Sequence, residues 1–160
     1  MVYNNLYNIY LEQAKILHSD PSKWRGVTLT HFLPEIKQII QAQSLKTILD
    51  YGCGKAEFHP PEWNATKYDP AVLKFSQKPV GRFDLVICTD VLEHIPVDGL
   101  QDTIKDLFDY SDKWVFISVC CRKAMEILPN GYNAHATVES QEWWEELLSG
   151  YENYTLRFSQ

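Results

Sequence analysis

The apolar residues of this 160-residue chain change their spacing near residue 45. Before that point they recur every three or four residues, which is the period of an amphipathic helix. One such stripe covers the first 17 residues and ends at His18-Ser-Asp-Pro21, and a second predicts a helix from about Thr30 to Gln43. The two stripes consist of Tyr3, Leu6, Tyr7, Tyr10, Leu11, Ala14 and Leu17, and of Phe32, Leu33, Ile36, Ile39 and Ile40.

After residue 45 the pattern changes to short apolar runs separated by helical segments. The runs predict strands at Thr47–Tyr51, Thr66–Asp69, Phe83–Thr89, Trp114–Cys120 and Tyr154–Phe158, with helices at Asp98–Tyr110 and Ser140–Leu148. Apolar strands that alternate with helices indicate a parallel sheet covered on both faces. We therefore predict an α/β fold in one domain, with residues 1–45 as an N-terminal helical lid and 46–160 as the core.

Composition narrows the classes of function. The net charge is −6 and no run of lysines or arginines is present, which argues against a footprint on duplex nucleic acid. The four cysteines form no C-x-x-C pair, so we expect free thiols in a reducing compartment. No 18-residue apolar stretch or leader segment stands out, and we expect a soluble, cytoplasmic protein without a membrane anchor.

The first candidate binding motif is ILDYGCGKA at residues 48–56. A buried strand ends at Asp50, and Gly52 and Gly54 follow in a tight turn where a backbone can approach a ligand closely. Asp69 stands at the end of the next predicted strand, where an acid can accept hydrogen bonds from a ribose diol. Glu57 then stands where a dinucleotide fingerprint has its third glycine, and Phe58 and two prolines follow shortly after. A nicotinamide cofactor is therefore disfavoured.

The second candidate motif is FDLVICTDVLEHIP at residues 83–96. Asp90, Glu93 and His94 stand at i, i+3 and i+4, so on a helical turn they share one face. With His135 they offer a mixed nitrogen and oxygen ligand set for Mg²⁺, Mn²⁺, Fe²⁺ or Zn²⁺. Two other interpretations stay open. His94 or His135 acts as a general base without a metal, or Glu93 and His94 only stabilise the turn.

Taken in order, ILDYGCGKA, YDP and FDLVICTDVLEH resemble the motif series of class I S-adenosylmethionine-dependent methyltransferases over about residues 45–150. The resemblance implies a Rossmann-like three-layer sandwich with a mostly parallel sheet. It also implies that the glycine loop holds the methionine part of the cofactor, that Asp69 holds the ribose, and that Thr89 to His94 border the sulfonium. The cofactor-binding residues expected on this basis are Asp50, Gly52, Cys53, Gly54, Asp69, Pro70, Thr89, Asp90 and Arg25, the last for the cofactor carboxylate.

The chain also departs from that family. Only 13 residues separate Asp69 from Phe83, too few for the usual helix, third strand and turn, and the acidic contact to adenine has no counterpart. We expect Leu73, Phe75 or Val80 to cover the adenine instead.

The resulting prediction is a methyltransferase that acts on an oxygen or nitrogen nucleophile of a small molecule by in-line transfer, with His94, His135 and Asp90 at the catalytic position. Similar acid-x-x-Glu-His sets with a distant histidine bind metal in small-RNA 3′-end 2′-O-methyltransferases and some ubiquinone-pathway O-methyltransferases. A metal-assisted O-methyltransferase of ribose or sugar hydroxyls is therefore one alternative. A non-catalytic S-adenosylmethionine-binding or interaction module is another.

Overall fold

The computed structural model describes residues 5–160, so Tyr3 of the first predicted stripe lies outside it. Four α-helices occupy the predicted segments: α1 (Leu6–His18), α2 (Leu29–Gln43), α3 (Val97–Tyr110) and α4 (Gln141–Leu148). The strands are β1 (Ile48–Tyr51), β2 (Thr66–Tyr68), β3 (Phe83–Thr89), β4 (Ser111–Cys120) and β5 (Tyr154–Ser159). Two short 3-10 turns, η1 (Leu73–Phe75) and η2 (Leu92–His94), complete the set. None of the helices described is long and apolar enough to cross a membrane.

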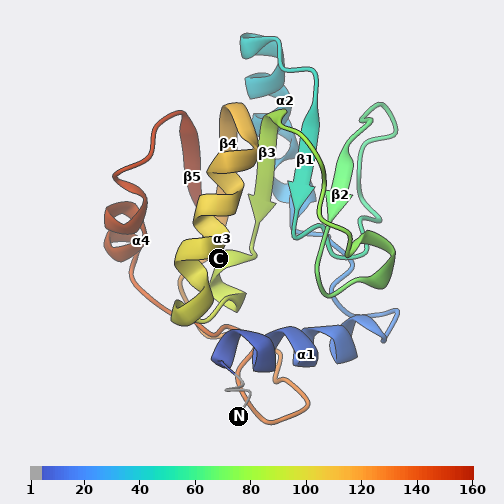
Figure 1. The fold of residues 1–160 in the computed structure, drawn as a ribbon, viewed down its shortest axis with the longest axis vertical. Coiled ribbons are helices and arrows are strands. Elements are labelled where there is room, and N and C mark those ends of the chain that lie inside the picture. The colour runs from blue at the N-terminus through green and yellow to red at the C-terminus, as the bar shows by residue number, and fades with distance from the viewer. Residues whose placement is uncertain (1–4) are drawn as a thin grey trace.

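The five strands form one sheet in the order β2-β1-β3-β4-β5, and each of the four pairings is parallel. The predicted α/β fold with a parallel sheet is confirmed. All strands end at the same edge of the sheet, which is the lower edge in Figure 1. Ligands of open parallel sheets bind at this edge.

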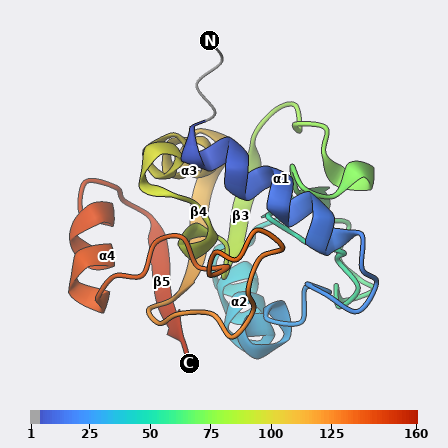
Figure 2. The ribbon, with the colours of Figure 1, turned by 90° about the horizontal axis from the view of Figure 1, so that it is seen from below.

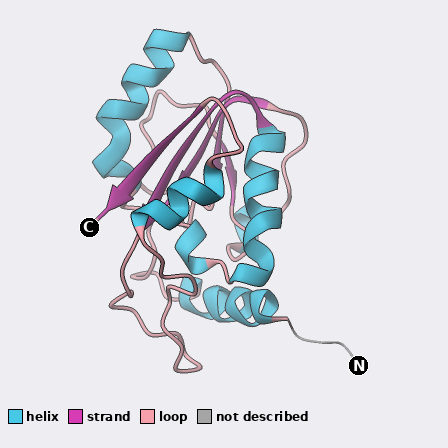
Figure 3. Ribbon diagram, turned by 90° about the vertical axis from the view of Figure 1, so that its left-hand side faces the viewer, coloured by secondary structure: helices cyan, strands magenta, loops and turns pink. Residues whose placement is uncertain are grey.

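Neighbouring residues of each strand belong to different cores, because successive side chains of a strand point to opposite faces. Leu49 and Val86 pack on the face that α3 and α4 cover. Ile48 and Leu85 pack on the opposite face, together with Ile36 of α2. The centre of the sheet is thus buried between helices on both sides, as the edge-on view shows (Figure 3), which explains the apolar runs in β1, β3 and β4.

Helix α1 does not join either helical layer. It lies across the end of the sheet where the strands finish, beside the loop between β4 and α4 (Figure 2). Tyr7 fixes α1 to α3: a β-carbon on Gly99 would come within 2.4 Å of the Tyr7 ring, and the Tyr7 amide donates to the Asp98 carboxylate at 3.3 Å. The N-terminal helix therefore covers the edge where a ligand would bind.

The connections flanking β2 contain no α-helix. Residues 52–65 form turns and irregular backbone, and residues 69–82 contain only the turn η1. Leu73 and Val80 are 92% and 94% exposed. The expectation that Leu73, Phe75 or Val80 covers an adenine ring is therefore not met, because none of the three lines the cavity described below. This segment has no buried element to hold its side chains over the site.

Candidate active site

A cavity of about 600 Å³ opens at the carboxyl ends of the strands. Its wall is formed by the ends of β1, β2 and β3, by α1 and the segment after it, and by the loop after β4. A volume of this size is typical of sites for cofactors and other small molecules. All nine residues expected to bind the cofactor line it, and so do His94 and His135.

The glycine loop, Gly52 to Gly54, lines the cavity. Neither glycine can be replaced without a clash, because a β-carbon at each position would meet a neighbouring residue. Gly52 has φ +76, and a β-carbon there would lie 2.4 Å from Cγ2 of Val91. Gly54 has φ +54, and its β-carbon would lie 2.8 Å from the carbonyl oxygen of Trp24. Side chains rarely adopt this backbone region, so glycine at both positions lets the loop pack closely against Val91 and Trp24.

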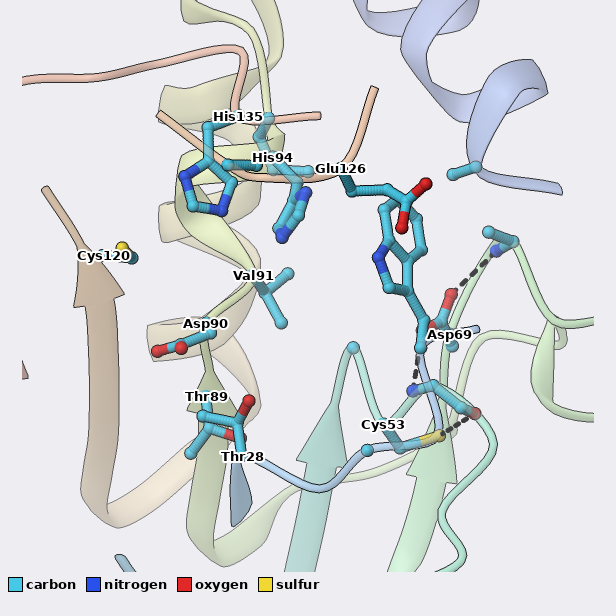
Figure 4. Close-up of a pocket in the computed structure, with 18 of the residues that line it drawn as sticks. Thr28, Cys53, Asp69, Thr89, Asp90, Val91, His94, Cys120, Glu126 and His135 are labelled. Atoms are coloured by element: carbon cyan, nitrogen blue, oxygen red, sulfur yellow. Dashed lines mark hydrogen bonds between the residues drawn. The ribbon is translucent and has the colours of Figure 1, made fainter. Parts of the chain in front are cut away.

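Asp69 is held by the same loop. Its Oδ2 accepts from the Gly54 amide and its Oδ1 from the Ala71 amide, each at 2.9 Å. Each oxygen keeps a further lone pair for a ligand hydroxyl. Burial raises the pKa of this carboxyl, while the two backbone hydrogen bonds oppose that shift. The acid at the end of β2 is therefore fixed in position beside the glycine loop (Figure 4).

Two histidines lie together on the β4 side of the cavity. The ring centroids of His94 and His135 are 4.8 Å apart and nearly perpendicular. Nδ1 of His94 lies 2.9 Å from the carbonyl oxygen of Ala134, and Nδ1 of His135 contacts that of Arg122. A carbonyl oxygen accepts only, so both Nδ1 atoms carry the proton and both Nε2 atoms keep a lone pair. Burial lowers the pKa of His94 to about 3.

Comparison with known families identifies the architecture. The model of a methyltransferase domain family matches residues 18–153. This chain belongs to the class I S-adenosylmethionine-dependent methyltransferases. No curated protein and no solved structure matches it. The match covers the glycine loop, Asp69 and both histidines, so the enzyme activity is S-adenosylmethionine-dependent methyl transfer.

The residues of the methyltransferase fit its cofactor. The cavity is large enough for a nucleoside joined to an amino acid. Gly52 and Gly54 line the cavity, and Asp69 offers acceptors at the neighbouring strand end. Thr89 and Pro70 line the same space. Cys53 lines it as a buried thiol whose pKa is raised by burial, so it stays protonated and contributes packing.

Asp50 and Arg25 both have partners within the protein. Nε2 of His59 lies 2.6 Å from Oδ2 of Asp50, and both side chains are buried. Nε of Arg25 donates to Glu57 at 2.6 Å, and its guanidinium lies 5.2 Å from the ring centre of Phe58. The terminal amino groups of Arg25 make no hydrogen bond within residues 5–160, so they remain available to a carboxylate.

Asp90 does not share a face with Glu93 and His94, contrary to the helical spacing predicted. It has a left-handed φ of 51°, and only the three-residue turn η2 follows. Its carboxylate accepts from Ser118 Oγ at 2.6 Å and from Ser159 Oγ at 2.8 Å. Because β4 and β5 take up both oxygens, the carboxylate points toward the sheet and away from the histidines (Figure 4).

Glu93 lies beneath the histidines and is fully buried. Its Oε1 accepts from the Cys120 amide at 2.9 Å, whereas Oε2 has no partner among residues 5–160. Burial, then the nearby charge of Asp90, raises the pKa of this carboxyl well above its usual range. One ligand atom each from Glu93, His94 and His135 lies within 4.8 Å of the other two, without Asp90.

Sequence reasoning missed several residues of the site. His18 ends α1 and lies 4.0 Å from Asp69, Trp24 lies between His18 and His94, and His59 pairs with Asp50. His18 reaches the site from the end of a helix, and Trp24 and His59 reach it from loops, so none of the three stands at a strand end. Of the three, only Trp24 has a left-handed backbone (φ +45), and it is followed closely by a glycine in the sequence Trp24-Arg25-Gly26.

Proposed function

We propose that this methyltransferase methylates an oxygen or nitrogen nucleophile of a small molecule, with His135 as the proton acceptor. The observation that carries the proposal is the pair of imidazoles whose Nδ1 atoms are bound to backbone carbonyl oxygens. This arrangement leaves Nε2 of each ring with a lone pair in the cavity, where a hydroxyl or ammonium proton can be accepted.

When bound, S-adenosylmethionine would supply an electrophilic methyl group for the nucleophile, with a neutral thioether as the leaving group. The protein contributes position and a proton acceptor. The glycine loop and Asp69 hold the cofactor, and the terminal amino groups of Arg25 bind its carboxylate. His135 takes the proton that the nucleophile loses.

His135 is a better base than His94 for this step. His94 is the more deeply packed ring, with Trp24 on one side and His135 on another, and its pKa of about 3 makes it a weak proton acceptor. In this proposal His94 orients the nucleophile as a hydrogen-bond acceptor. Asp90, bound by two serines, acts as a positioning residue for the turn that carries His94.

The test is transfer of labelled methyl from S-adenosylmethionine to a pool of small hydroxyl and amine compounds, with products identified by mass. The wild-type protein should give a product in which an oxygen or nitrogen has gained a methyl group. His135→Gln should abolish transfer and still bind S-adenosylhomocysteine. Transfer only to protein or nucleic acid, or full activity of His135→Gln, would contradict the proposal.

A second candidate function is metal-assisted methylation of a sugar or ribose hydroxyl, which the unpartnered Oε2 of Glu93 supports. Both histidines donate their other nitrogen to a backbone carbonyl, an arrangement that commonly fixes metal ligands. Glu93, His94 and His135 would hold the ion. A divalent ion in this place would favour the deprotonated form of a hydroxyl.

Calorimetric titration with Mn²⁺ tests this candidate without an activity assay. The wild-type protein should bind one ion, and Glu93→Gln and His135→Gln should lose it. Asp90→Asn should keep it, because Asp90 lies outside the cluster. Equal binding by wild-type protein and Glu93→Gln, or none at all, would remove the metal from the mechanism.

The remaining proposals concern the setting of the reaction. Residues 1–45 act as a lid on the core formed by residues 46–160, which α1 supports by its place across the strand ends (Figure 2). A cytoplasmic location agrees with four free cysteines. The net charge of −6 supports a small-molecule substrate rather than duplex nucleic acid.

A further inference from the structure

The Asp69 end of the cavity is closed by two residues of the N-terminal segment, His18 and Trp24. Residues 72–82, where adenine recognition was expected, contribute nothing to the cavity wall. The part of the site beside the ribose acid is therefore built from α1 and the segment that follows it.

His18 makes no hydrogen bond within residues 5–160. Its side chain is 7% exposed, and its Nδ1 is buried without a partner among the described residues. Its Nε2 lies 4.0 Å from Oδ2 of Asp69, which is too far for a direct hydrogen bond. An oxygen atom to one side of the line joining these two atoms can lie at hydrogen-bond distance from both.

Trp24 lies directly beyond His18. Its indole is edge-to-face with His18 at 5.2 Å and with His94 at 5.0 Å. Its backbone is left-handed, with φ +45, a conformation that persists only where neighbours enforce it. The enforcing contacts are with the glycine loop: Lys55 donates to the Lys23 carbonyl, and the Glu57 amide donates to the Arg25 carbonyl at 3.4 Å.

We propose that His18 and Trp24 bind the nucleoside of the cofactor, His18 through a ribose hydroxyl that it shares with Asp69 and Trp24 through the adenine ring. A neutral imidazole donates from one nitrogen, so the hydroxyl accepts from His18 and donates to Asp69. An indole offers a purine a stacking or edge contact without reading its polar groups. The pair thus replaces the missing acidic adenine contact.

Burial supports the neutral form of His18. It lowers the pKa of the ring to about 4, and the charge of Lys55 adds to the shift. Near pH 7 the ring therefore carries one proton and one lone pair, as the proposed hydrogen bond requires.

The inference rests on cofactor binding by this site, so its test begins with S-adenosylhomocysteine titrated calorimetrically into the wild-type protein. His18→Leu and Trp24→Leu should each raise Kd about tenfold or more. Trp143→Leu, a tryptophan of α4 that does not line the cavity, should leave Kd unchanged. Absence of binding by the wild-type protein would overturn the cofactor assignment itself. Unchanged Kd in both cavity variants would overturn only the roles of His18 and Trp24.

Two further readouts distinguish direct contact from a structural role. Loss of the shared hydroxyl, in the 2′-deoxy or the 3′-deoxy analogue of S-adenosylhomocysteine, should weaken binding by the wild-type protein more than binding by His18→Leu, in which that hydroxyl keeps only its bond to Asp69. An equal loss in both proteins would exclude the His18 contact. S-adenosylhomocysteine should also change the tryptophan emission of the wild-type protein, and this change should vanish in Trp24→Phe while binding persists. An unaltered change in Trp24→Phe would exclude the Trp24 contact.

Discussion

Ser118 donates a hydrogen bond of 2.6 Å to Asp90 and thereby turns the first acid of the Asp-x-x-Glu-His motif toward the sheet. Ser159 holds the second carboxylate oxygen at 2.8 Å. The carboxylate thus links β4 and β5 to the turn that follows β3. Its role is to hold that turn in position.

Asp90→Ala should therefore destabilise the fold. Hydrogen bonds to a charged group contribute about 1.5–3 kcal/mol each, so we expect the free energy of unfolding to fall by about 3 kcal/mol in a denaturant titration. Asp102→Ala, an exposed position of α3, is the matched control and should change it by less than about 0.5 kcal/mol. Equal effects at the two positions would show that the serine contacts contribute nothing.

A second prediction concerns the stability of the fold and follows from the close approach of Gly52 to Val91. Gly52→Ala combines a positive φ with a clash of 2.4 Å and should cost about 3 kcal/mol of unfolding free energy. Gly131→Ala, at φ +88 with open space around it, reports the cost of the backbone conformation alone, about 1 kcal/mol. Val91→Ala should relieve the clash, so the Gly52→Ala/Val91→Ala double variant should be more stable than the sum of the single changes. Strict additivity would rule out the contact.

Glu93 makes a third prediction, measured in chelator so that no metal binds. Its pKa is raised in the folded state, so the proton it keeps stabilises the fold below the unfolded pKa of about 4.5, and this stability is lost as pH rises through the folded pKa. Glu93→Gln imitates the protonated form and should be about 2 kcal/mol more stable than wild-type protein near pH 8. Glu145→Gln on the exposed side of α4 should show no such gain. A Glu93→Gln protein less stable than wild type at that pH would show that folding does not raise the pKa of Glu93.

A fourth prediction concerns His18, whose pKa is shifted in the opposite direction from that of Glu93. Its pKa is lowered to about 4 in the folded state, so protons bind the unfolded chain more tightly and stability falls as pH drops from about 6.5 toward 4. This one group should cost the wild-type protein about 2 kcal/mol between about pH 7 and pH 5. His18→Leu should lose that part of the slope, whereas His31→Leu, exposed on α2, should keep it. Identical slopes in wild type and His18→Leu would show that His18 is not buried as a neutral ring.

The strands could be predicted closely because each apolar run is sharply bounded. Phe83–Thr89 has the predicted limits, whereas β4 begins at Ser111, three residues before the predicted Trp114. Its first residues are polar, but Ser111 still pairs with Phe83, since backbone pairing requires no apolar side chain. The pattern of apolar residues indicates which residues are buried, so it cannot locate the exposed end of a strand.

The candidate site was predictable chiefly where strand ends supply it, although Arg25 and His135, which lie outside the strands, were also predicted and line the cavity. Asp50, Asp69 and Thr89 meet because parallel strands end at one edge of the sheet. The side-chain direction of Asp90 was missed because a left-handed residue interrupts the helical spacing. His18 and Trp24 come from a segment whose path over the glycine loop depends on tertiary contacts, which local periodicity does not encode.

The most direct test of the account is a calorimetric titration of the protein with S-adenosylhomocysteine, repeated with Asp69→Ala. We predict one site with micromolar affinity in the wild-type protein, and no measurable binding by Asp69→Ala under the same conditions. Asp102→Ala should bind like wild type. The absence of heat and of any thermal shift at millimolar ligand in the wild-type protein, or undiminished binding by Asp69→Ala, would contradict the assignment of the cofactor to this cavity.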